Sequence, residues 1–434
     1  MKPVALSLEQ TPPLSVPLRF FVTAPLFAMA AAAVMLWYGP EILASRWMPP
    51  LLAVTHLVTL GFISMTMIGA VHQLLPVLMA SPIPLPRVTS SVIHFLLTTG
   101  TVLFGMGMVS GTAGLLRGAM MALGTGLAIF IMVAAYCLVE ARSRHATVYS
   151  MALAMAALAV TAAMGLLLLG AYALPSLQIP RYLTDLHLIW GMLGWVGLLV
   201  SGVAYQVVPM FQLTLNYPAA MMRWLAGVLF MALTGWSVSP LLPPSSAGLL
   251  RPVAGAVVAG GYWMFASTTL RLQQRRHRRL PDVSVEFWRM ALISLQLAML
   301  LWIARPFFGS SRQEILLGML LIVGFAMSVI SGMLYKIVPF LVWLHLNNRM
   351  QEQGRWGEKI PNMKEIISPL RIRWQFRLQL ASLLLLLASV IWPQPLLRPA
   401  ALLFFAAFFL LWWNLLEGVR IYLRSVRQKE TNVI

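Results

Sequence analysis

Two histidines, His56 and His187, lie inside long apolar segments and carry side chains that could bind a metal or a cofactor. His56 precedes Pro76 by 20 residues and His187 precedes Pro209 by 22, so both fall near the starts of segments that share a pattern. Imidazole inside a membrane is costly and rare, which makes each a candidate functional residue. Neutral imidazole is the commonest metal ligand and a usual axial ligand of haem. The pair therefore predicts a metal or haem site, with two unrelated histidines hydrogen-bonded between helices as the alternative.

Met319 and Asp185 extend this candidate site. Met319 precedes Pro339 by 20 residues, the same offset as that of His56. A methionine thioether can be the second axial ligand of haem iron, although simple packing is the alternative for one of 28 methionines. Asp185 precedes His187 by two residues and could orient its ring, or could instead cap the helix that follows.

A second group of polar residues falls near the other ends of the same segments. Gln73, Gln206 and Lys336 occupy the same place in the shared pattern, and His72 stands where the other two segments have tyrosine. If the three long side chains converge, they form a cluster that could carry protons or bind an anionic group. The alternative is that Lys336 extends to the membrane surface, with His72 as a polar partner for Gln206 or Lys336.

The composition indicates the class of protein to which these residues belong. Of 434 residues, 60% are hydrophobic and 10% are charged, with a mean hydropathy of +0.82. Soluble domains carry about 25% charged residues, so a soluble enzyme and a disordered chain are excluded. The net charge of +19 lies mainly in short loops, where it sets membrane topology, and no nucleic-acid partner is expected. The single cysteine, Cys137, excludes a disulfide framework.

Twelve apolar segments are long enough to cross a bilayer, so the predicted fold is an all-α polytopic membrane protein. Most of the 31 lysines and arginines fall on the side that holds both termini, which predicts that both termini are cytoplasmic. Residues 1–18 form a cytoplasmic N-terminal segment, residues 19–423 one membrane domain, and residues 424–434 a cytoplasmic tail. The predicted spans are 19–38, 50–80, 91–111, 115–139, 148–172, 184–212, 221–240, 251–271, 286–304, 315–345, 374–393 and 397–423.

The second, sixth and tenth spans carry an internal repeat. Each contains a glycine followed by an aromatic residue, a second glycine eight residues after the first, and a proline seven further on. The offsets between successive copies are 133 and 130 residues. A constant period indicates one structural unit that is copied. We therefore expect a pseudo-threefold arrangement of four-helix units at about 19–139, 148–271 and 286–423.

These features resemble subunit I of the haem–copper oxidase superfamily, which includes the nitric oxide reductases. The tenth span of that family reads His-x-His, then Gly-x-x-Gly-Trp or similar, then Gly, Tyr and Pro. The sixth span here reads His187-Leu-Ile-Trp-Gly-Met-Leu-Gly-Trp195, followed by Gly202, Tyr205 and Pro209. His56 is similar to the histidine of the family's second span that ligates the low-spin haem. The resemblance covers the whole chain by topology, and its motifs lie in spans 2, 6 and 10.

The departures from the family pattern limit what the resemblance implies. Ile189 stands where the second histidine of the His-x-His motif would be, and the seventh span lacks the family's pair of copper-binding histidines. Because a copper site of imidazoles generally needs about three ligands, copper is not expected. The resemblance implies at most one haem b, held by His56 and His187 or by Met319 with one of them.

The resulting expectation is a haem-binding protein of the bacterial inner membrane. It would transfer electrons, or bind nitric oxide or oxygen, rather than carry out full oxygen reduction, and whether it is a divergent oxidoreductase stays open. Its expected partners are the lipid bilayer, a diatomic gas, and a cytochrome or other respiratory subunit. Two alternatives remain: a transporter or channel without haem on the same scaffold, and a structural subunit of a respiratory or denitrification complex.

Overall fold

The structure is a computed structural model that describes residues 10–79, 81–141, 145–174, 177–180, 182–276, 282–308, 310–353 and 360–431. Every regular element in these ranges is helical. The sequence explains why: apolar segments inside a bilayer must satisfy every backbone N–H and C=O internally, and a helix does so within one segment. The prediction of an all-α fold is confirmed.

The long helices follow the apolar segments closely. They are α1 (Ser15–Tyr38), α2 (Pro49–Val58), α3 (Met65–Met79), α4 (Pro86–Ser110), α5 (Ala113–Val139), α6 (Ala146–Ala173), α7 (Tyr182–Ile189), α8 (Leu198–Gln212), α9 (Ala219–Val238), α10 (Pro244–Gln274), α11 (Val283–Phe308), α12 (Ser311–Met319), α13 (Ser328–Glu352), α15 (Pro369–Ser389) and α16 (Pro393–Thr431). Short elements complete the order: η2 (Gly39–Leu43), η5 (Ser239–Leu241) and α14 (Met363–Ile366).

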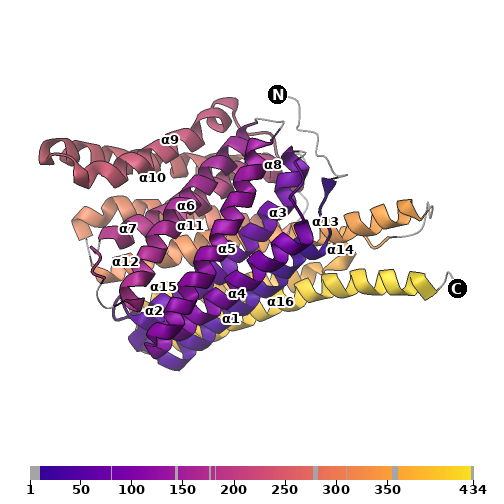
Figure 1. Ribbon diagram of the computed structural model, residues 1–434, viewed down its shortest axis with the longest axis horizontal. Helices are drawn as coiled ribbons and strands as arrows, with labels where there is room; N and C mark the ends of the chain where they lie inside the picture. The colour runs from indigo at the N-terminus through magenta and orange to yellow at the C-terminus, as the bar shows by residue number, and fades with distance from the viewer. Residues whose placement is uncertain are drawn as a thin grey trace.

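Eleven continuous helical segments of the described residues are long and apolar enough to cross a membrane. The segment expected to be the eleventh of twelve spans corresponds to α15, which is not among these eleven because it begins with several arginines. It nevertheless packs lengthwise against α16, and α16 packs in turn against α1, so that the last helix lies beside the first (Figure 1). The chain has the helices of an integral membrane protein.

Three of these segments are interrupted by a short π-helical stretch at matching places. The stretches are η3 (Thr59–Ser64) between α2 and α3, η4 (Trp190–Gly197) between α7 and α8, and η6 (Leu320–Met327) between α12 and α13. A π stretch widens the helix by one residue per turn and changes the direction in which the flanking side chains point; it is frequent at functional sites. The three segments that carry the repeated sequence pattern therefore carry the same local distortion.

The repeated glycines make equivalent close contacts. In each of the three segments, both pattern glycines face the helix that comes first in its predicted four-helix unit: α1, α6 or α11. A Cβ on these glycines would stand 2.3–2.9 Å from a side-chain atom of that helix, closer than real Cβ atoms approach, so the two backbones meet only because these residues are glycine. The contacts are Gly61 with Phe27, Gly69 with Phe20, Gly194 with Ala157, Gly202 with Ser150, Gly324 with Ser294, and Gly332 with Phe287.

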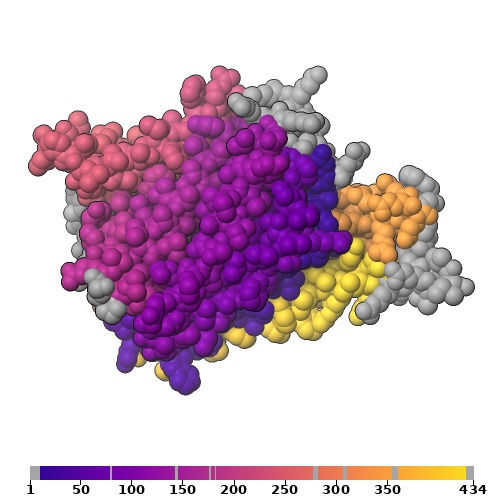
Figure 2. Space-filling view, viewed as in Figure 1, coloured from indigo at the N-terminus to yellow at the C-terminus, as the bar shows by residue number. Residues whose placement is uncertain are grey.

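The three distorted segments run in the same direction through the molecule. Figure 1 shows α2, α7 and α12 toward one end and α3, α8 and α13 toward the other. We call these ends the α2 side and the α3 side. On the α3 side, α13 and α16 project beyond the other helices (Figure 1), and the space-filling view shows the end of α13 protruding from the main body (Figure 2).

Candidate functional site

A cavity of about 300 Å³ lies on the α2 side, between the three distorted segments. His56 of α2, His187 of α7 and Met319 of α12 all line it. Most of the remaining wall is aliphatic or aromatic, including Phe104 and Trp195. The structure therefore brings together the three residues that the sequence proposed as ligands, one from each segment of the repeat.

The two histidine rings are neighbours. Their centroids are 6.1 Å apart and their planes are inclined by only 21°. At this separation one group bound in the cavity could contact both rings.

Each histidine is fixed through the same ring atom. Nδ1 of His56 lies 2.9 Å from the carbonyl oxygen of Leu52, and Nδ1 of His187 lies 3.0 Å from the carbonyl oxygen of Thr161. A backbone carbonyl only accepts, so each Nδ1 carries the proton and donates it. This tautomer leaves Nε2 with a free lone pair, the form that a metal needs from histidine.

An ion-pair network closes the cavity on the α2 side. Arg46, which lies between η2 and α2, contacts the carboxylate of Asp185 at 2.8 Å through Nη1 and that of Glu314 at 3.1 Å through Nε. Arg305 of α11 pairs with the other oxygen of Glu314 at 2.7 Å. The Arg46 guanidinium also stacks on Trp47, with 4.5 Å from Cζ to the ring centroid. The network thereby connects the starts of all three distorted segments.

The network shows what Asp185 does. Its carboxylate pairs with Arg46, and the ring of His187 is oriented by the Thr161 carbonyl. Asp185 therefore acts on the arrangement of the helices at the mouth of the cavity, and not on His187 through a direct hydrogen bond.

His72 lies outside this cavity, in the core of the molecule. Its ring is stacked between Phe20 and Phe130, with centroid distances of 5.5 and 5.6 Å, and is 1% exposed. Nδ1 donates to the carbonyl oxygen of Ile68 at 2.8 Å, and Nε2 is buried without a hydrogen-bond partner among the described residues. The hydrogen bond of His72 is thus to its own helix and not to Gln206 or Lys336.

The three long side chains on the α3 side do not form one contact group. Gln73 and Gln206 line a second cavity, which Lys336 does not line. The ammonium of Lys336 instead pairs with Asp282 at 2.7 Å, and the lysine is about a quarter exposed. Lys336 thus pairs with a carboxylate next to the start of α11, at the edge of the bundle. The free-energy cost of a charged side chain is lower there than at the centre of the bilayer.

Some residues of the site carried no signal in the sequence. Arg46 and Glu314 are charged residues at the ends of apolar runs, and this position alone indicates only topology. Thr161 acts through its backbone, which no side-chain pattern reveals. Within the described part of the chain, no group of three or more His, Cys, Asp or Glu could hold a metal ion. The groups in the cavity wall that could ligate a metal are the two imidazoles, the carboxylate of Glu314, which is already paired with Arg46 and Arg305, and the thioethers of Met35, Met192 and Met319.

Comparison with known proteins adds no relative: no family model matches the chain, and no curated protein matches it.

Proposed function

We propose that this protein binds one haem b between His56 and His187 and transfers electrons within the membrane. The observation that carries the proposal is the pair of near-parallel imidazole rings 6.1 Å apart in one cavity, each with Nδ1 occupied by a backbone carbonyl. With both imidazoles as ligands, the iron would have no open position, which favours electron transfer over the binding of oxygen or nitric oxide. A haem supplies a one-electron couple in such a site.

The cavity suits the chemistry of the group. Ligand cavities typically measure about 300–1,000 Å³ and are mostly apolar with a few polar groups, and this cavity lies at the lower end of that range. Most of its wall is apolar, and the carbonyls of Leu52 and Thr161 hold both imidazoles in the ligating tautomer. Arg46 is the cation among the residues of the wall, and its guanidinium is paired with Asp185 and Glu314.

A reduced-minus-oxidised absorption spectrum of the purified chain, expressed with ample haem, tests the proposal. We expect a b-type spectrum that disappears in His56→Ala and in His187→Ala. His145→Ala is the matched control, because His145 precedes α6 on the α3 side and does not line the cavity. The wild type is expected not to bind carbon monoxide. A wild-type protein without haem contradicts the proposal.

We further propose twelve spans, with α15 as the eleventh, both termini in the cytoplasm of a bacterial cell, and membership of the haem–copper oxidase subunit I superfamily. The excess of basic residues on the α3 side supports this orientation. In a Cys137→Ser background, a membrane-impermeant thiol reagent applied to intact cells should label Ser245→Cys at the start of α10. It should reach Gln353→Cys at the end of α13 only after lysis. The reverse pattern contradicts the orientation.

A transporter without haem is the second candidate, because one observation favours it. Two cavities follow one another along the same three segments: Ser64 lines the first, and Thr66, two residues further along, lines the second. Transporters built from repeats hold their solute sites at the interface between the repeats. Solute uptake by vesicles that contain the purified protein, together with an absent haem spectrum, would favour this function over electron transfer.

A further inference from the structure

The second cavity lies on the axis between the three distorted segments, toward the α3 side, and measures about 140 Å³. Its wall is formed mainly by α3, α8 and α13, which contribute residues at matching positions, such as Ala70, Val203 and Met333. Trp288 of α11 and Phe21 of α1 complete it. None of its lining residues lines the cavity that contains His56 and His187, so the two are distinct.

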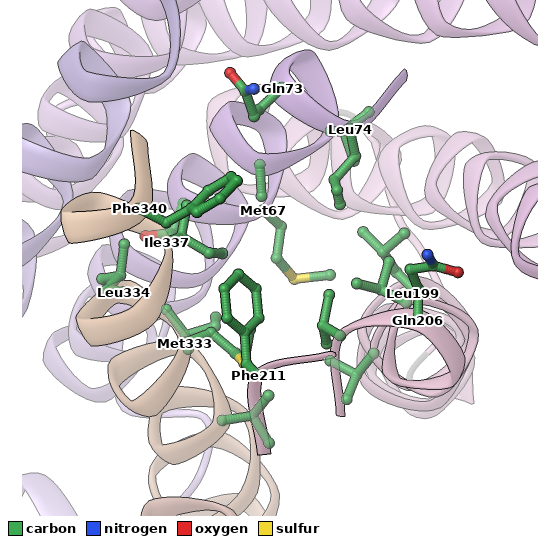
Figure 3. A pocket seen from close by; sticks show the side chains of 18 of the residues that line it. Met67, Gln73, Leu74, Leu199, Gln206, Phe211, Met333, Leu334, Ile337 and Phe340 are labelled. Carbon is green, nitrogen blue, oxygen red and sulfur yellow. The ribbon is translucent and has the colours of Figure 1, made fainter. Parts of the chain in front are cut away.

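The wall of this axial cavity is apolar. Figure 3 shows the thioether of Met67 and the rings of Phe211 and Phe340 directed toward its interior. The two glutamines at its edge, Gln73 and Gln206, turn their amide groups away from the centre (Figure 3). A water molecule in a cavity needs two to four polar partners, and polar atoms form almost none of the surface of this cavity, so water is poorly held there.

We propose that the axial cavity binds a small, uncharged, apolar molecule in the size range from a diatomic gas to a single six-membered ring. The closest physical comparison is an engineered apolar cavity of about 150 Å³, which stays dry and binds xenon or benzene. The axial cavity has nearly the same volume and the same kind of wall. A complete acyl chain of a membrane lipid is too large for it.

This binding site does not depend on haem, because the two cavities share no lining residue. It also has a structural reason to remain open. The glycines of the repeated pattern hold α3, α8 and α13 tightly against α1, α6 and α11. Packing against these outer helices limits how far the three inner helices can move together to fill the axis.

Crystals of the full-length protein pressurised with xenon test the proposal, because xenon is apolar, fits the volume and gives anomalous density. We expect a xenon peak in the axial cavity of the wild type. Val203→Phe places a ring in the cavity and should abolish that peak. Val228→Phe, the same change at an exposed position of α9, is the matched control and should leave the peak unchanged.

A smaller filling variant keeps the test decisive if the phenylalanine prevents folding. Ala70→Leu adds three carbons to the same wall and should lower xenon occupancy by several-fold. Three results would overturn the proposal: no peak in the wild-type cavity, an equal peak in both filling variants, or continuous acyl-chain density through the cavity. The result for xenon is independent of the haem spectrum, so failure of one proposal is distinguishable from failure of the other.

Discussion

Gly165 of α6 lies directly against the imidazole of His187. A Cβ added to Gly165 would stand 2.8 Å from Cε1 of the ring, closer than real Cβ atoms approach any neighbour. The same helix supplies the Thr161 carbonyl that receives the hydrogen bond of His187. The position of this ring is therefore determined by α6, through one missing side chain and one backbone oxygen.

Gly165→Ala should displace His187 and weaken haem binding. Groups that orient a metal ligand typically contribute about 10–100-fold in metal affinity, and we expect a loss of that size. Titration of haem into the haem-free protein measures it. Gly260→Ala is the matched control, because nothing lies within 4 Å of a Cβ at Gly260 of α10, and its affinity should equal that of the wild type. Equal affinity of both variants would show that this contact does not position the ring.

Met319→Leu should leave the haem spectrum unchanged. If the imidazoles of His56 and His187 are the two axial ligands, the thioether of Met319 only packs in the cavity wall, and leucine has a similar volume. The absorption spectra of oxidised and reduced protein measure this directly. A changed spectrum or a newly acquired affinity for carbon monoxide would assign Met319 as a ligand in place of one histidine.

Arg46→Gln should lower the stability of the protein by about 1–3 kcal/mol. The substitution removes two charge-assisted contacts and leaves the Asp185 carboxylate without its cation in a position that is about one-fifth exposed. Heating with a thiol-reactive dye reports the change, because the single cysteine, Cys137, is buried and reacts only when the bundle opens. Arg117→Gln, at an exposed arginine of the same side, should unfold at the wild-type temperature.

Gly202→Ala should destabilise the contact between α8 and α6. Its Cβ would stand 2.3 Å from Cβ of Ser150, and forcing extra atoms into a close-packed contact costs about 1–3 kcal/mol. Ser150→Gly in the same chain should recover part of the loss, and a double-mutant cycle with thermal unfolding measures this coupling. Additive effects of the two substitutions would contradict a direct contact.

Much of the framework could be predicted from residue types alone. Runs of Leu, Ala, Met and Phe near 20 residues long place the helices, because only a helix satisfies its backbone inside a bilayer. The offsets from Pro76 and Pro209 place His56 and His187 at nearly the same depth, since depth along a helix grows by a fixed rise per residue. The span predicted at 374–393 corresponds to α15, whose arginines lower its hydropathy.

The sequence by itself thus determined an all-helical membrane protein, the three segments with a shared pattern, and the depth of each candidate ligand. Only the tertiary structure decided that His56 and His187 share a cavity, that Arg46 joins Asp185 to Glu314, and that Lys336 pairs with Asp282. The physical reason is that depth depends on position within one helix. The direction in which a side chain points depends on the π-helical stretches η3, η4 and η6 and on the neighbour that each helix packs against.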